Sequence, residues 1–182
     1  MSPFRVTGSR TVCEAGFLRV DEVAVAGPGG ERFRRTVVRH PGAVVVVPVR
    51  DGRALLVRQF RAAVGTDLLE APAGKRDVDG EPPTETARRE LAEELGVRAG
   101  RLVPVAEFHN SPGFCDEHSY LFVATELVEL GTRQAMGPEE RELRVEEVRL
   151  ADTEALIARR ELVDAKTIIG LLLARQLVDG AA

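Results

Sequence analysis

The apolar run AVVVVPV at residues 43–49 constrains the fold of this chain more than any other segment. A short, fully apolar stretch bounded by turn residues is typical of a buried strand. A second such stretch, ALLVRQFR at 54–61, follows a turn at Asp51-Gly52. Two core strands of one sheet are therefore expected here. The run at 43–49 is too short to span a bilayer, so no membrane partner is expected.

The other elements follow from composition and turn residues. Residues 17–39 predict a hairpin, because two β-rich stretches flank a glycine-rich turn at 27–30. Further strands are expected at 102–109, 119–127 and 145–150, a loop at 70–83, and helices at 84–95, 152–160 and 164–178. Strands with one central helix and helices at the end predict an α/β sandwich.

Composition excludes several classes of protein. The chain has 182 residues, 44% of them hydrophobic and 30% charged, which suits one globular domain with a small appended segment. The net charge of -4 provides no basic footprint for nucleic acid. Cys13 and Cys115 are the only cysteines, too few for a disulfide framework and without a zinc spacing. A reducing, cytoplasmic location is expected.

The helix at 84–95 carries a cluster of carboxylates. At about 100° per residue, Glu90, Glu93 and Glu94 fall within one arc of the helix. Each like-charge pair costs only a few tenths of a kcal/mol on a solvated helix, but a partly buried cluster needs protonation or cations. Hard divalent cations with oxygen ligands, Mg²⁺ above all, suit such a cluster.

A solvated acidic face is the alternative for this helix. Arg88 and Arg89 are spaced to pair with Glu85 and Glu93 along the helix. The segment alone does not decide between an acidic scaffold helix without chemistry and a metal site. The glycine-rich loop directly upstream, EAPAGKRDVDGE, favours the metal site.

The stretch from Gly74 to Val97 resembles the Nudix box. That motif consists of a glycine, a glutamate some residues later and the pattern REUXEEXGU, where U is an aliphatic residue. Everything from Glu81 onward matches, and one extra residue lies between Gly74 and Glu81, where a loop insertion is cheap. The resemblance implies the Nudix α/β/α sandwich with a mixed β-sheet. It also implies an enzyme, a pyrophosphatase acting on nucleoside diphosphate derivatives.

The same resemblance implies the roles of the box residues. Glu90 and Glu94 would be the principal metal ligands, with Glu93 and the backbone carbonyl of Ala73 as further ligands. The implied cofactor is Mg²⁺, with Mn²⁺ as a substitute. Arg89 would orient the glutamates, and Glu93 and Arg89 count among the catalytic residues. Gly74 would allow the loop to approach the helix.

Residues outside the box resemble the ADP-ribose pyrophosphatase subfamily. Pro112 lies sixteen positions after Gly96, and the phrases SPGFCDEHSYLFVATEL and ELVDAKTIIGLLLARQL resemble its loop, following strand and C-terminal helix. This implies hydrolysis of ADP-ribose to AMP and ribose 5-phosphate. Another nucleoside diphosphate derivative, such as a sugar nucleotide or a dinucleotide cofactor, is the alternative substrate, and a non-catalytic nucleotide-binding module is a further alternative.

The subfamily resemblance also implies substrate contacts. Arg39 and Arg61 match positions that hold phosphate or the terminal ribose. Glu117 matches a position that forms hydrogen bonds with ribose hydroxyls. Phe17 matches an aromatic residue that stacks on adenine. Pro112 and Gly113 would belong to the substrate loop. For each of these residues an ordinary structural role, as a surface arginine, a core aromatic or a turn, remains the alternative.

The catalytic base is expected on a loop after the sheet, between Gly131 and Arg144. Glu139 is favoured there and Glu140 comes next, with Glu142 as a third candidate. A carboxylate on such a loop can approach the attacking water once substrate is bound.

Two regions are expected along the chain. Residues 1–40 would form an N-terminal β segment that serves as a dimerisation element, and residues 41–182 the Nudix hydrolase domain. The expected partners are a nucleotide substrate and a second copy of the chain.

Overall fold

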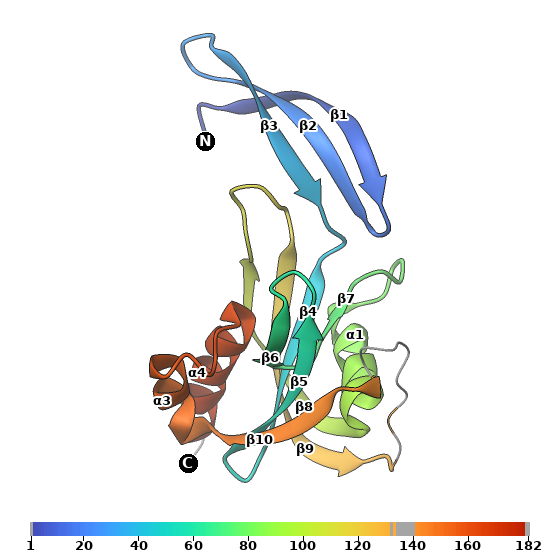
Figure 1. Cartoon of the computed structure of the whole chain (residues 1–182), viewed down its shortest axis with the longest axis vertical. Helices are drawn as coiled ribbons and strands as arrows, with labels where there is room; N and C mark the ends of the chain where they lie inside the picture. Colours follow the sequence, from blue (N-terminus) through green and yellow to red (C-terminus); the bar gives the residue numbers. More distant parts are fainter. Residues whose placement is uncertain (1, 132, 134–140, 181–182) are drawn as a thin grey trace. The chain divides into compact units, whose positions relative to one another are not determined.

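The computed structural model describes residues 2–131, 133 and 141–180. They divide into two compact units (Figure 1). The N-terminal unit comprises residues 1–42 and 108–119, and the larger unit residues 43–107 and 120–182. The segment at 108–119 thus belongs with the N-terminal strands. The assignment of 1–40 to dimerisation and of 41–182 to hydrolysis stays a prediction.

The N-terminal unit is built on a three-stranded antiparallel sheet in the order β1-β2-β3. The strands are β1 (Arg5–Ala15), β2 (Leu18–Ala26) and β3 (Arg32–Arg39). The predicted hairpin is present as β2 and β3, with Ala26 opposite Arg32 across the turn. The sequence reading did not resolve β1 as a separate strand, because every residue of it is exposed and leaves no alternation of buried and exposed positions.

The loop that contains Pro112 and Gly113 is tied to β3. The amide of Val38 donates to the carbonyl of Phe114 at 2.7 Å, and the amide of Asp116 donates to the carbonyl of Val38 at 3.1 Å. A parallel bridge joins Val38 to Cys115. Backbone hydrogen bonds therefore hold residues 114–116 beside the end of β3.

The larger unit contains a seven-stranded sheet in the order β10-β5-β4-β9-β8, with β6 paired to β5 and β7 paired to β4. Helix α1 continues directly into the π-helix η1, and Gly96 ends this continuous helical segment in the left-handed conformation at φ 67°. The bounds are β4 (Ala43–Arg50), β5 (Arg53–Arg61), β6 (Thr66–Glu70), β7 (Ala73–Lys75), α1 (Pro83–Glu90), η1 (Leu91–Leu95), β8 (Val97–His109), β9 (His118–Glu129), β10 (Arg144–Arg149), η2 (Leu150–Asp152), α3 (Thr153–Ala158) and α4 (Ala165–Asp179).

Helices cover both faces of this sheet. Val44 and Val46 of β4 pack in one apolar cluster with Ala87 and Leu91 of the central helical segment. On the other face, Gly170 of α4 lies so close to the sheet that a Cβ atom there would be 2.6 Å from Cγ2 of Val47. Figure 1 shows α1 and α4 on opposite sides of the sheet. The predicted α/β sandwich with a mixed sheet is confirmed, and its two covered faces explain why the run 43–49 is apolar at every position.

Two local predictions were wrong in part: a strand interrupts the loop expected at 70–83, and the helix expected at 84–95 is present but is not α-helical throughout. Residues 70–83 are not entirely loop, because Ala73–Lys75 forms β7 and pairs antiparallel with β4. The central helix is not a regular α-helix to its end, because Leu91–Leu95 is π-helical. A π segment widens the helix, so the angles derived from about 100° per residue do not apply beyond Glu90.

Among the described residues, no helix combines the length and the apolar composition of a transmembrane segment.

Candidate active site

Glu90 and Gly74 are in direct contact. Glu90 is the last residue of α1 and is 7% exposed. A Cβ atom on Gly74 would lie 1.8 Å from Oε1 of Glu90 and 1.9 Å from its carboxyl carbon. Any side chain at position 74 would therefore displace this carboxylate. The glycine brings strand β7 against the acidic face of the central helical segment.

Arg89 connects three glutamates of the larger unit. Its Nη1 donates to Oε1 of Glu90 at 2.6 Å and to Oε2 of Glu93 at 3.2 Å, and its Nε and Nη2 reach Glu81 at 3.4 and 3.3 Å. Burial acts to lower the pKa of Arg89, but the hydrogen bond to Glu81 and the charges of Glu90, Glu81 and Glu93 outweigh it, so the pKa is raised. One permanent cation thus balances the repulsion within the cluster.

Glu81 is held from a second side by Thr86. The buried hydroxyl of Thr86 donates to Oε2 of Glu81 at 2.7 Å. The hydrogen bond from Arg89 lowers the pKa of Glu81, and the one from Thr86 lowers it further. Glu81 is therefore an ionised anchor that fixes the position of the Arg89 guanidinium.

Glu93 and Glu94 lie on the π-helix η1. Glu94 is 6% exposed, whereas the side chain of Glu93 is 22% exposed. The guanidinium of Arg133 donates to the carbonyl of Glu94 at 3.4 Å and to that of Leu143 at 3.1 Å. This bridge ties the end of η1 to the segment that leads into β10.

The residues of this cluster suit a hard divalent cation in their chemistry. Carboxylate and backbone carbonyl oxygens are the ligands that Mg²⁺ prefers. Gly74 has no side chain, so the carboxylate of Glu90 fits beside the backbone of β7, which begins at Ala73. In the described part of the chain, no group of three or more acidic, histidine or cysteine side chains is arranged to hold a metal ion. Here Arg89 contacts both Glu90 and Glu93. The ligand roles of Ala73, Glu90, Glu93 and Glu94 stay predictions.

Arg61 belongs to the same unit and pairs with a buried acid. Its Nε and Nη2 donate to Oε1 and Oε2 of Glu70 at 2.9 and 2.6 Å, and Glu70 is 2% exposed. This two-point hydrogen bond raises the pKa of Arg61. A bidentate pair fixes the plane of the guanidinium, so Arg61 is a rigid cation rather than a free surface arginine.

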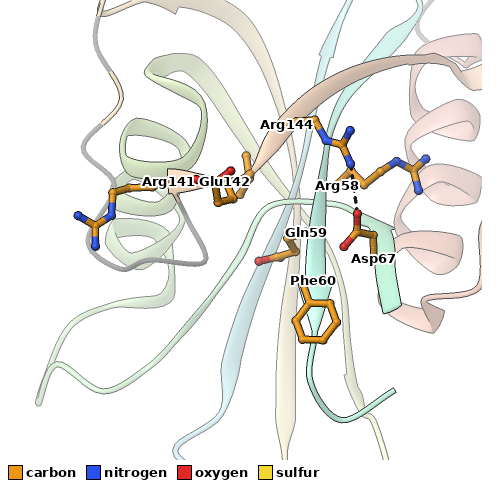
Figure 2. Close-up of a pocket in the computed structure, with 8 residues that line it drawn as sticks. Arg58, Gln59, Phe60, Asp67, Arg141, Glu142 and Arg144 are labelled. Atoms are coloured by element: carbon orange, nitrogen blue, oxygen red, sulfur yellow. Dashed lines mark hydrogen bonds and ion pairs between the residues drawn. The ribbon is translucent and has the colours of Figure 1, made fainter. Parts of the chain in front are cut away.

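A pocket of about 670 Å³ opens beside β5, β6 and the start of β10 (Figure 2). Its lining includes the buried amide of Gln59, the half-exposed ring of Phe60 and the carboxylate of Glu142. Arg144 pairs with Asp67 at 3.1 Å along one wall. Glu142, the third candidate for the base, is therefore a pocket residue, whereas Glu139 and Glu140 lie outside the described residues.

Arg39 is held by two carboxylates of the N-terminal unit. Its Nε donates to Oδ2 of Asp21 and its Nη1 to Oδ2 of Asp116, both at 3.0 Å. The hydrogen bond to Asp21 raises the pKa of Arg39, and the one to Asp116 raises it further. Asp116 also accepts from the amide of His40, whose ring lies edge-on to Phe17 at 5.3 Å. Phe17 and Arg39 thus belong to one connected group.

The remaining predicted contacts also lie in the N-terminal unit. Pro112 and Gly113 are exposed, and a Cβ atom on Gly113 would meet nothing within 4 Å. Glu117 is partly buried, and its carbonyl accepts from the amide of Asn110 at 3.3 Å. Arg61 and the glutamates of the box belong to the larger unit.

Sequence reasoning missed the acids that hold the predicted arginines. Glu70, Asp21 and Asp116 have no motif spacing to Arg61 or Arg39. Strand pairing brings Glu70 and Asp21 to these arginines, and the loop tied to β3 brings Asp116 to Arg39. Glu70 gave a usable signal, since it lies in the apolar context LLEAPA, where an acid needs a partner.

Comparisons with known proteins find a matching family, similar proteins and a similar solved structure. Residues 38–168 match the family described as NUDIX domain. The chain is 42% identical over 151 residues to an ADP-ribose pyrophosphatase of Bacillus subtilis, a match that covers 82% of this chain and 80% of that protein. It is 38% identical over 166 residues to an ADP-ribose pyrophosphatase of Mycobacterium tuberculosis, covering 91% of this chain and 79% of that protein. The crystal structure of an ADP compounds hydrolase has the same fold, with a TM-score of 0.87 at 24% identity over 100% of this chain and 97% of that one.

Proposed function

Because the chain belongs to the Nudix hydrolase family, we propose that it hydrolyses the pyrophosphate bond of ADP-ribose and releases AMP and ribose 5-phosphate. Two relatives named ADP-ribose pyrophosphatase, at 42% and 38% identity and with about four-fifths of their length matched, support this substrate. The resemblance between residues 74–97 and the Nudix box is confirmed by the family match, which includes the whole stretch.

The contact of Glu90 with Gly74, inside the Arg89 cluster, is the observation that supports the chemistry most directly. Glu90 and Glu94 would hold Mg²⁺, together with Glu93 and the carbonyl of Ala73. Bound there, Mg²⁺ would supply charge neutralisation at the pyrophosphate and an activated water. Arg89 would orient the glutamates, because its guanidinium is fixed on Glu81 and reaches Glu90 and Glu93.

Substrate binding would use cations that are already oriented. Arg61, fixed on Glu70, would bind phosphate oxygens through its guanidinium. In the N-terminal unit Arg39 would bind phosphate or ribose, Phe17 would stack on adenine and Glu117 would accept from ribose hydroxyls. Pro112 and Gly113 would line the substrate loop. The base would be Glu139 or Glu140, or else Glu142 on the wall of the pocket.

The N-terminal β segment would build a homodimer with a second copy of the chain, which an exposed edge strand such as β1 permits. The enzyme would act in the cytoplasm.

A panel of pyrophosphates tests the substrate assignment. ADP-ribose, a sugar nucleotide and a dinucleotide cofactor would be compared by kcat/KM at saturating Mg²⁺, with the products identified as AMP and ribose 5-phosphate. We expect ADP-ribose to rank among the best substrates. If it does not, the substrate is another nucleoside diphosphate derivative, whereas the metal chemistry stands.

Substitutions in the box test the metal chemistry separately. Glu93→Gln and Glu94→Gln should each abolish Mg²⁺-dependent hydrolysis while the circular dichroism spectrum stays that of the wild type. Unchanged turnover in both variants would refute the metal site. The absence of any Mg²⁺-dependent hydrolysis in the wild type, on every substrate of the panel, would favour a scaffold helix or a binding module.

A further inference from the structure

The N-terminal turn of α4 is connected by a side chain to the segment that precedes β7. The hydroxyl oxygen of Thr167 accepts a hydrogen bond from the amide of Ala71 at 2.8 Å. The same hydroxyl donates to Oδ2 of Asp164 at 2.7 Å. Thr167 is fully buried and Ala71 is 1% exposed, so water has no access to replace this bond.

Asp164 determines the direction in which the hydroxyl points. Its carboxylate also accepts from the amide of Thr167 at 2.9 Å and from Nζ of Lys166 at 2.6 Å. An ionised carboxylate only accepts, so the single hydroxyl proton of Thr167 is directed at Asp164 and a lone pair remains for Ala71. The arrangement is a relay with one polarity rather than a pair of interchangeable hydrogen bonds.

Ala71 lies between Glu70, which holds Arg61, and Ala73, whose carbonyl is a proposed metal ligand. Immediately before it, Glu70 holds Arg61. Two residues after it, Ala73 starts β7 opposite Val45 of β4. Between them, the carbonyl of Pro72 accepts from the amide of Val46 at 2.9 Å.

The bond to Thr167 thus ties this segment to α4. The other backbone ties run within the sheet, from Val45 and Val46 of β4 and from the pairing of Glu70 with Val57 of β5. A buried amide without a partner carries a large penalty. Removal of the hydroxyl would therefore let residues 70–74 shift until the amide of Ala71 finds another acceptor or reaches water.

We propose that Thr167, oriented by Asp164, is a positioning residue that holds residues 70–74 and thereby sets the place of the Ala73 carbonyl and of the Glu70–Arg61 pair. The part that concerns the Ala73 carbonyl rests on the proposed metal site. The part that concerns the segment itself rests on the hydrogen bonds alone.

Two threonines with buried hydroxyls allow a matched test. Thr167→Val removes the relay while keeping the shape of the side chain, and Thr167→Ser restores a hydroxyl. Thr153→Val is the control, because Thr153 is equally buried and its hydroxyl donates to the carbonyl of Leu150 at 2.8 Å, away from the segment. Asp164→Asn, which retains an acceptor but no charge, is the second variant should Thr167→Val not fold.

The first readout is amide hydrogen exchange of the peptide that covers residues 69–75 in the metal-free protein. We expect faster exchange there in Thr167→Val, a partial increase in Asp164→Asn, and rates close to the wild type in Thr167→Ser and Thr153→Val. Unchanged exchange in Thr167→Val would overturn the proposal. An equal increase in Thr153→Val would do so too, because it would indicate general destabilisation.

The second readout is direct binding of Mn²⁺ to the substrate-free protein, measured by electron paramagnetic resonance. Displacement of an outer residue that supports a metal ligand typically weakens affinity by about 10- to 100-fold, and we expect a loss of about tenfold in Thr167→Val. If exchange rises but Mn²⁺ affinity does not change, the link to the Ala73 carbonyl is wrong. Neither readout uses ADP-ribose, so a failure of the proposed substrate leaves this result intact, and a wild type that binds no Mn²⁺ counts against the metal site alone.

Discussion

Replacing Gly74 with alanine adds one methyl group at the point where β7 meets the carboxylate of Glu90. The new Cβ atom would lie 1.8 Å from Oε1 and 2.6 Å from Cγ of that side chain. An ordinary contact begins at 3.4 Å, so the carboxylate must retreat by the difference between 3.4 and 1.8 Å, about 1.6 Å.

The expected effects on stability and on activity differ in size. The displaced atoms end a flexible side chain, so the free energy of unfolding should fall by only about 1 kcal/mol, the low end of overpacking costs. A misplacement of about 1 Å in a catalytic group can cost about 100-fold in rate. We therefore expect Gly74→Ala to lose at least about 100-fold in kcat/KM while remaining folded.

Urea denaturation and steady-state turnover at saturating Mg²⁺ measure the two effects. Gly8→Ala is the control for a plain glycine-to-alanine change, because a Cβ atom there meets nothing within 4 Å. In a Glu90→Ala background the clash is gone, so Gly74→Ala should cost no further stability. A folded Gly74→Ala enzyme with wild-type turnover, or additive stability losses in the double variant, would refute this reasoning.

Three other substitutions have defined outcomes. Arg89→Lys should lose about tenfold or more in kcat/KM with little change in melting temperature. One ammonium group cannot reproduce the several hydrogen bonds that the guanidinium makes to the glutamates. Wild-type kinetics would contradict the positioning role of Arg89. Gly170→Ala should lower the free energy of unfolding, measured by urea denaturation, by about 1–3 kcal/mol. The reason is that its Cβ atom would lie 2.6 Å from Cγ2 of Val47. An unchanged urea midpoint would contradict the close packing of α4 on the sheet. Burial acts to raise the pKa of Asp164, but the charge of Lys166 and the hydrogen bonds from Thr167 outweigh it, so the folded-state pKa is lowered. The ionised form then stabilises the fold above about pH 4, and this stabilisation is lost as the pH falls through the folded-state pKa. The stability difference between the wild type and Asp164→Asn should therefore shrink in acid, and a difference that stays constant with pH would contradict the assignment.

Local patterns predicted the main elements because each pattern reports on burial. The run 43–49 is apolar throughout because both faces of β4 are covered. A backbone preference gave one further signal, because Gly96 ends the central helical segment in the left-handed conformation. Where burial leaves no pattern, the individual strand was not predicted. Strand β1 is exposed at every position, and β7 has only three residues, too few for any alternation.

The π-helix at Leu91–Leu95 could not be read from the sequence either. Its residues, LAEEL, are ordinary helix formers. The helix is widened by its backbone hydrogen-bond pattern, which forms within the packed unit. The residue types do not indicate that pattern. The positions of Glu93 and Glu94 around the helix consequently depend on packing.

The amino-acid sequence by itself determined the carboxylate cluster, the glycine that admits it and the arginine that balances it. These residues lie within one short stretch, Gly74 to Gly96, and their types and order alone identify the cluster. The contact of Gly74 with Glu90 and the directions of Glu93 and Glu94 depend on packing. Only the tertiary structure decided what holds this stretch in place. Glu70 meets Arg61, and Thr167 meets Ala71 across 96 positions of sequence. Such contacts join separate elements, so they leave no periodic trace in the sequence. The first arises when β5 pairs with β6, and the second when α4 packs on the sheet.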